Sequence, residues 1–328
     1  MAFWSKIMRQ KAEDWTYLEL DQDQVPTRLG REVIGPDTGY LTLTLKSLRI
    51  VDVRKGLKRF YGAVHSWSSV SHAAQGRVEF QVVTTPSELK DADAAHLDRV
   101  ISMDRPLLGP VPYRGGGLEL ELGLFSILSQ DLTGPFLDVL ENMSKAAGVT
   151  FVTAARPFVE PLTQGISLLT GTTGDSLLEV GLSKAWEPTT GYYAILRAPR
   201  GRIRQEDVRV ASDQRLVDAN GNAIQDYPYI VFSVETRRDR PNWFEIPELK
   251  TAYDELEAEA RRGRVDDVEQ AFAVFRRAAL LSPDLLFDDA KLIVNKVDAR
   301  LKEVLGSAQT AGRPPAPLPE LKEFSPFS

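Results

Sequence analysis

The chain contains no cysteine and only three histidines, His65, His72 and His96, among its 328 residues. The absence of cysteine excludes a thiolate nucleophile, a zinc–thiolate site and a disulfide framework, so a reducing interior suits this sequence. Imidazole acid–base chemistry has only these three candidates. The composition therefore favours binding over turnover, and we expect no enzymatic activity, no cofactor and no metal.

The sequence also lacks a long hydrophobic run and an excess of positive charge. No window approaches the roughly eighteen apolar residues of a membrane span, and the N-terminal stretch MAFWSKIMRQKAEDW lacks the uninterrupted apolar core of a signal peptide. The formal net charge is −6, which gives no overall attraction to nucleic acid. We therefore expect a cytoplasmic protein that does not bind nucleic acid.

Alternation of apolar and polar residues predicts β-strands between residues 40 and 240. The clearest strand follows Gly117, where four leucines alternate with Glu119, Glu121 and Gly123, as expected for one buried and one solvated face. The other predicted strands are the segments 40–51, 60–70, 78–85, 176–186, 191–199 and 227–237.

Helical spacing appears in two other parts of the chain. Residues 131–172 contain an amphipathic helix followed by a stretch interrupted by proline and glycine, and we interpret them as a helical insertion between strands. Three further helices are predicted at about 246–262, 265–281 and 284–305; in the last, Leu292 and Ile293 begin the apolar stripe.

These patterns predict an α+β fold in which an antiparallel β-sandwich of roughly C2-like architecture precedes a C-terminal helical bundle. We divide the chain into an amphipathic lead and connector (1–39), the sandwich with its insertion (40–240), the helical region (241–305) and a proline-rich, extended tail (306–328).

Two groups of residues are candidates for partner binding. The first is the amphipathic lead, whose apolar residues recur at helical spacing and pack either on the body or on a partner or membrane: Phe3, Trp4, Ile7, Met8 and Trp15. The second is the strongest local cluster of positive charge: Arg197, Arg200, Arg202 and Arg204. We expect these arginines to pair with the acidic helical region or across an interface.

The function we predict from the sequence is a non-enzymatic adaptor or scaffold that binds other proteins in a bacterial cytoplasmic complex. The segment PPAPLPELKEF of the tail is a further docking candidate, because it can adopt polyproline II. One alternative is a peripheral membrane-binding module that acts through residues 1–20 and 149–172. Another is a hydrolase that uses His65, although no glycine-flanked nucleophile elbow accompanies it.

Overall fold

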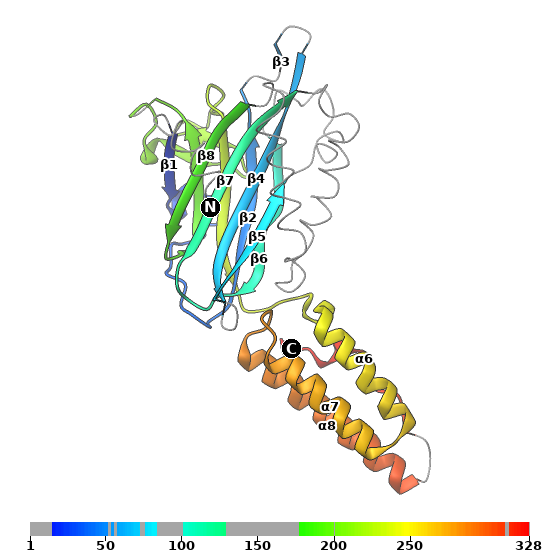
Figure 1. The fold of residues 1–328 in the computed structure, drawn as a ribbon. Helices are drawn as coiled ribbons and strands as arrows, with labels where there is room; N and C mark the ends of the chain where they lie inside the picture. Colours follow the sequence, from blue (N-terminus) through cyan, green and yellow to red (C-terminus); the bar gives the residue numbers. More distant parts are fainter. Residues whose placement is uncertain are drawn as a thin grey trace.

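The described part of the chain forms antiparallel sheets followed by three helices (Figure 1). This computed structural model describes residues 15–51, 54–55, 58–72, 76–83, 101–128, 177–199, 201–311 and 315–327. The prediction of antiparallel sheets with a helical C-terminus is confirmed. The predicted helical insertion at about 131–172 lies outside the described residues.

The first sheet has five antiparallel strands, and strands from both ends of the chain meet in it. Its order is β1 (Trp15–Leu20), β9 (Gly191–Arg197), β12 (Tyr229–Arg237), β2 (Tyr40–Arg49) and β6 (Ile101–Pro112). A short hairpin of β10 (Val208–Val210) and β11 (Leu216–Asp218) lies beside it. Because β2 and β12 lie inside the sheet, most of their side chains are buried: the others of β2 are half-buried, and only the end of β12 reaches solvent.

The second sheet is built around β4 (Lys58–His72) and β7 (Leu118–Leu128), which pair along eleven register positions. Its remaining strands are β3 (Arg54–Lys55), β5 (Gly76–Val83) and β8 (Leu177–Trp186). β3 pairs with the beginning of β4 and β5 with its end, while β8 lies along the other side of β7.

The two sheets share one apolar core, and we call them together the two-sheet body. Alternating leucines of β2 and β7 meet in this core, among them Leu43, Leu45, Leu120 and Leu122. Each fully buried leucine side chain stabilises the fold by about 1.5–3 kcal/mol relative to an exposed one. The alternation in the sequence thus selects the faces that pack together.

The structure differs from the sequence prediction at β1. Helical spacing is predicted for residues 1–20, but Trp15–Leu20 form a strand that pairs with β9. Leu18 and Leu20 are buried on one face of this strand. The apolar residues of this segment therefore recur every two positions. The helical spacing of the residues before Trp15 hides this alternation when residues 1–20 are read as one segment.

Strand β6 was missed for a different reason. The stretch Ile101–Pro112 contains three prolines, which argue against a central strand. Within the described residues β6 pairs only with β2, and the register shifts at several points. An irregular edge strand tolerates the missing N–H donors of proline, so the prolines mark the edge of the sheet and not the absence of a strand.

The predicted C-terminal helices are present as α6 (Pro247–Arg262), α7 (Val265–Leu280) and α8 (Phe287–Ala311). α6 ends at Gly263, whose positive φ of 71° gives the left-handed C-cap that glycine adopts without strain. Their facing sides form a second apolar core, separate from that of the two-sheet body.

The tail is not the free extended segment that its prolines suggest. Leu318, Leu321 and Phe324 are buried in the core of the helices, and Leu321–Phe324 form the short 3₁₀ helix η8. The hydroxyl of Tyr253 donates a hydrogen bond to the carbonyl of Pro319. We call α6, α7, α8 and residues 315–327 the helical module. Apolar residues between the prolines anchor this segment to the module, so this part of PPAPLPELKEF is already occupied by the chain itself.

A buried ion pair joins the exit from the sheets to the helical module. Arg240 follows β12 and Asp284 lies between α7 and α8, and both side chains are 0% exposed. Nη2 of Arg240 lies 3.1 Å from Oδ1 of Asp284, and Nη1 donates to the Asp284 carbonyl at 2.9 Å. Burial lowers the pKa of Arg240, against the opposing effect of the Asp284 charge.

Further hydrogen bonds connect the same loop to the two-sheet body. The buried Tyr40 of β2 donates from its hydroxyl to Oδ2 of Asp289 at 2.5 Å and accepts from the backbone N–H of Leu286 at 3.2 Å. Arg114 donates to the carbonyl of Leu285 at 2.8 Å. The helical module is therefore held to the body through its α7–α8 end, as Figure 1 shows.

Replacing Asp284 by Ala should destabilise the protein by about 3–5 kcal/mol, because the buried guanidinium of Arg240 loses its counter-charge. Urea unfolding of the full chain measures this loss. Asp239→Ala is the matched control, since Asp239 pairs with Arg237 on the surface, where an ion pair is worth less than about 1 kcal/mol. Equal losses in the two variants would contradict the role assigned to the buried pair.

Candidate binding groove on the helical module

The predicted aromatic lead is described only at its end. Phe3, Trp4, Ile7 and Met8 lie outside the described residues. Trp15 lies on β1, partly buried, and packs against the core of the two-sheet body. At this residue the lead packs on the body, which is one of the two alternatives that the sequence leaves open.

The predicted arginine cluster makes its ion pairs locally. Arg204 pairs with Asp207, with Nε 3.0 Å from Oδ2. Nη1 of Arg197 lies 3.8 Å from Oε2 of Glu179. Arg202 is described and exposed, whereas Arg200 lies outside the described residues. Figure 1 places this part of the chain at the end of the body away from the helices. Within the described residues Arg197 and Arg204 thus pair locally and not with the acidic helical region, and pairing across an interface stays a prediction.

His65, the candidate for hydrolysis, lies on β4 with 2% of its surface exposed. Burial lowers the pKa of its imidazole to about 3, and a hydrogen bond with Gln81 opposes that shift only in part. The side chain is therefore neutral at neutral pH and has little contact with solvent. This position argues against its action as a general base on a soluble substrate.

The alternating glutamates of β7 differ from the expectation of a solvated face. Glu119 is partly exposed and lies 3.4 Å from Arg77, but Glu121 is only 7% exposed. Burial raises the pKa of Glu121, although Ser183 donates a hydrogen bond to it at 3.4 Å. Alternation shows that these glutamates face away from the leucines, but it does not show whether another part of the chain covers them.

Lys184 of β8 contacts residues of β1 at the edge of the two-sheet body. Its Nζ lies 3.9 Å from the ring centroid of Tyr17 and 5.4 Å from that of Trp186. The same atom is 3.0 Å from Oε1 of Glu19. The ammonium group of Lys184 thus contacts two aromatic rings and a carboxylate of the same chain. This cluster connects β1 to β8 and is not an open binding site.

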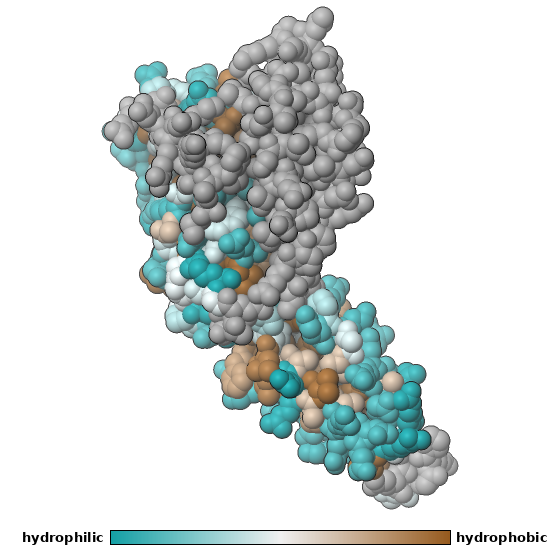
Figure 2. Space-filling model, in the orientation of Figure 1, coloured by the Kyte–Doolittle hydropathy of each residue, from teal (hydrophilic) through white to brown (hydrophobic). Residues whose placement is uncertain are grey.

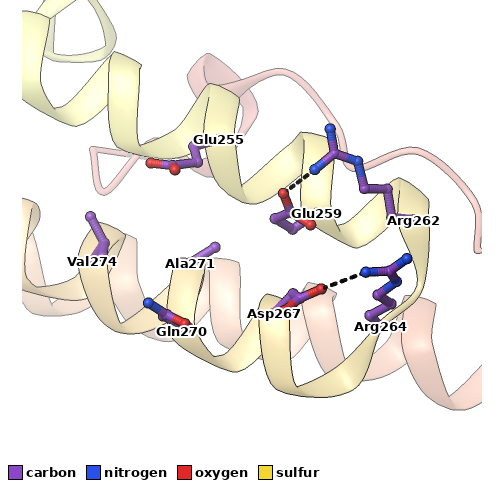
Figure 3. Close-up of a pocket in the computed structure, with 8 residues that line it drawn as sticks. All are labelled: Glu255, Glu259, Arg262, Arg264, Asp267, Gln270, Ala271 and Val274. Atoms are coloured by element: carbon purple, nitrogen blue, oxygen red, sulfur yellow. Dashed lines mark hydrogen bonds and ion pairs between the residues drawn. The ribbon is translucent and has the colours of Figure 1, made fainter.

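The groove between α6 and α7 is polar, and four of its five charged side chains form ion pairs with one another (Figure 3). In Figure 3 Arg262 points to Glu259 and Arg264 points to Asp267. Its volume is about 440 Å³. A ligand would have to displace these internal ion pairs, so this groove is the weaker candidate.

The groove between α7 and α8 combines apolar side chains with unequal charge. Its volume is about 570 Å³. The apolar residues that line it are Phe272, Leu280, Phe287 and Val294, and the polar ones are Arg276, Lys291, Asn295, Asp298 and Lys302. On α7 the lining residues recur every four positions, so they lie on one face of that helix.

Positive charge dominates this α7–α8 groove, with three cationic side chains against one carboxylate. Lys302 uses the carboxylate, with Nζ 2.7 Å from Oδ2 of Asp298. Nζ of Lys291 lies 4.6 Å from the ring centroid of Phe287. Among the residues that the structure describes, no carboxylate lies within ion-pair distance of Arg276 or Lys291. Two cationic groups are thus available to an incoming ligand.

Apolar residues around the same helices remain exposed. Leu281 is 67%, Phe287 51% and Leu292 46% exposed. Figure 2 shows apolar surface on the helical module near its junction with the body. The sequence places Leu292 in the apolar stripe of α8, but its side chain lies outside that stripe: the buried residues of the helix begin at Ala290 and continue with Ile293, whereas Leu292 is exposed. The signal for this surface in the sequence is an apolar residue that does not fit the helical period.

In the described ranges no group of three or more histidine, aspartate or glutamate side chains is arranged to hold a metal ion, and none of the helices described is long and apolar enough to cross a membrane. No protein-family model matches the sequence, and neither a curated protein nor a solved structure matches it significantly.

The burial of His65 predicts how stability depends on pH. In the unfolded chain His65 gains a proton near its ordinary pKa of 6.5, whereas in the folded protein it stays neutral down to about 3. The unfolded state therefore binds more protons in this window, and stability falls as the pH falls through it. The raised pKa of Glu121 acts in the opposite direction.

His65→Gln removes only the contribution of this histidine to the pH dependence of stability. Between about pH 7 and pH 4.5, wild type should lose about 2–3 kcal/mol more unfolding free energy than His65→Gln, at about 1.4 kcal/mol per pKa unit. Urea unfolding at the two pH values measures the difference, and all carboxylates are common to both proteins. Parallel pH profiles would show that His65 is not held neutral by burial.

Proposed function

We propose that this chain is a non-enzymatic adaptor or scaffold that binds partner proteins in a bacterial cytoplasmic complex, with its helical module as the main binding surface. The observation that carries the proposal is the α7–α8 groove, in which the exposed Phe287 and other apolar side chains lie beside cationic groups that lack a carboxylate partner among the described residues. Contiguous exposed apolar surface bordered by polar residues is typical of protein-binding sites.

The junction with the two-sheet body supports this function. The buried pair of Arg240 and Asp284 and the bonds of Tyr40 fix the end of α7 and the beginning of α8. A surface that is already ordered loses less conformational entropy when a partner binds. The two-sheet body then acts as a support that presents the groove. We infer a β-sandwich of roughly C2-like architecture for this body, and its two sheets with a shared core support that inference.

The other functions predicted from the sequence have less support. Membrane binding depends on residues 1–20 and 149–172, of which only Trp15–Leu20 are described, and these form a strand of the body. Hydrolysis depends on His65, which is buried. Partner binding by the remaining lead residues and by the arginine cluster stays a prediction.

Co-purification from the cells that naturally produce the protein tests the adaptor proposal. The tagged full chain should retain a partner protein in near-stoichiometric amount. The variant Phe287→Asp should lose that partner at least about tenfold, equivalent to about 1.4 kcal/mol, because it places charge on the exposed apolar lining of the groove.

Val33→Asp is the matched control, since Val33 is a highly exposed apolar residue of the two-sheet body. This variant should retain the partner at the wild-type level. Circular dichroism and urea unfolding verify that all three proteins are folded. A full chain that carries no stoichiometric partner, or equal loss in the control, would refute the helical module as the binding surface.

A further inference from the structure

We propose that the α7–α8 groove receives an acidic amphipathic helix of the partner protein. This inference rests on the proposed adaptor function and names the chemistry of the segment that docks. The length of the groove, its apolar lining and its charge support this inference.

The dimensions of the groove suit a helix. Its lining residues on α8 extend from Phe287 to Lys302, about 22 Å at 1.5 Å per residue. On α7 they extend from Phe272 to Leu280, about 12 Å by the same rise. A helix of roughly fifteen residues has the length of the longer wall. Two neighbouring helices with an apolar groove between them form the surface on which amphipathic helices dock.

Apolar and charged side chains both occur along the groove, and two of the apolar ones lie near one of its ends. Leu280 and Phe287 lie close to the turn that joins α7 to α8, while Asp298 and Lys302 lie further along α8. Leucine-like side chains of a docking helix would bury apolar area against the first group. Their burial stabilises the complex by about 25 cal/mol for each Å² of apolar surface removed from water.

The positive charge of the groove favours an acidic partner. Arg276 and Lys291 come from opposite walls of the groove and have no carboxylate within ion-pair distance among the described residues. Glutamates on both flanks of a docking helix would meet one cation from each wall. Like charges in those positions would be repelled, so the same two residues favour an acidic helix and disfavour a basic one.

The sequence of the chain itself contains one competitor of the required kind. The segment 131–148 carries Asp131, Asp138 and Glu141 against the single cation Lys145, beside an apolar stripe. The first fourteen residues are also amphipathic, but they hold three basic and two acidic side chains. A test must therefore distinguish a separate acidic helix from the chain's own acidic segment.

The test measures binding of three synthetic peptides to the full-length protein by fluorescence anisotropy. The first is a helical peptide of about sixteen residues with leucines on one face and glutamates on both flanks. The second replaces every glutamate by lysine, and the third has the sequence of residues 131–148. The acidic peptide should bind at least about tenfold more tightly than the lysine peptide, and its affinity should fall as salt is added.

Variants of the groove localise the binding. Arg276→Glu/Lys291→Glu should weaken the acidic peptide at least about tenfold and strengthen the lysine peptide. Lys250→Glu/Arg277→Glu makes the same change of charge at exposed positions outside the groove and should leave both affinities unchanged. The neutral variant Arg276→Gln/Lys291→Gln should give an intermediate affinity and covers a failure of the charge-reversed protein to fold.

Equal affinity for the acidic and lysine peptides, or unchanged affinity in the groove variants, overturns the inference. Tighter binding of the 131–148 peptide, lost in the groove variants, also overturns it, because the occupant would then be this chain. The adaptor function fails separately, in the co-purification experiment. If a partner is retained there while no acidic peptide binds, the chain is an adaptor that uses another surface or another class of ligand.

Discussion

The arrangement of this protein depends on one buried ion pair, between Arg240 and Asp284. Arg240 follows the last strand of the first sheet, and Asp284 lies in the connection between α7 and α8. Neither side chain reaches water, so separating them would leave a charge in an apolar interior. Tyr40, buried at the beginning of β2, adds hydrogen bonds to the same connection. The orientation of the helices is thereby tied to the packing of the sheets.

An exposed groove lies beside the junction of the helices with the two-sheet body. Helices α7 and α8 bury their common stripe in the helical module and are fixed at one end by the two-sheet body. Phe287 and Leu281, beside this junction, remain exposed. Exposed apolar surface bordered by polar residues is typical of interaction sites. In the function that we propose, the junction that stabilises the fold also orders the binding surface.

Much of the fold was predictable because its signals are local. Alternation identified β2, β4, β7 and β12, and helical spacing identified α6 to α8 to within a few residues at most ends. The failures have local causes as well. Prolines concealed β6, although they are tolerated on an edge strand, and the spacing of the preceding residues concealed β1. The docking of Leu318 and Phe324 was missed because proline content does not indicate whether an apolar groove is available.

The sequence by itself determined the alternating strands, the three C-terminal helices and the absence of any thiol chemistry, since each follows from residue identity and short-range spacing. Only the tertiary structure decided that Glu121 is buried, that Leu292 is exposed and that Arg240 meets Asp284. The reason is distance along the chain. Periodicity assigns a side chain to a face, but what covers that face comes from elements far away, such as Asp289, which lies 249 residues beyond Tyr40.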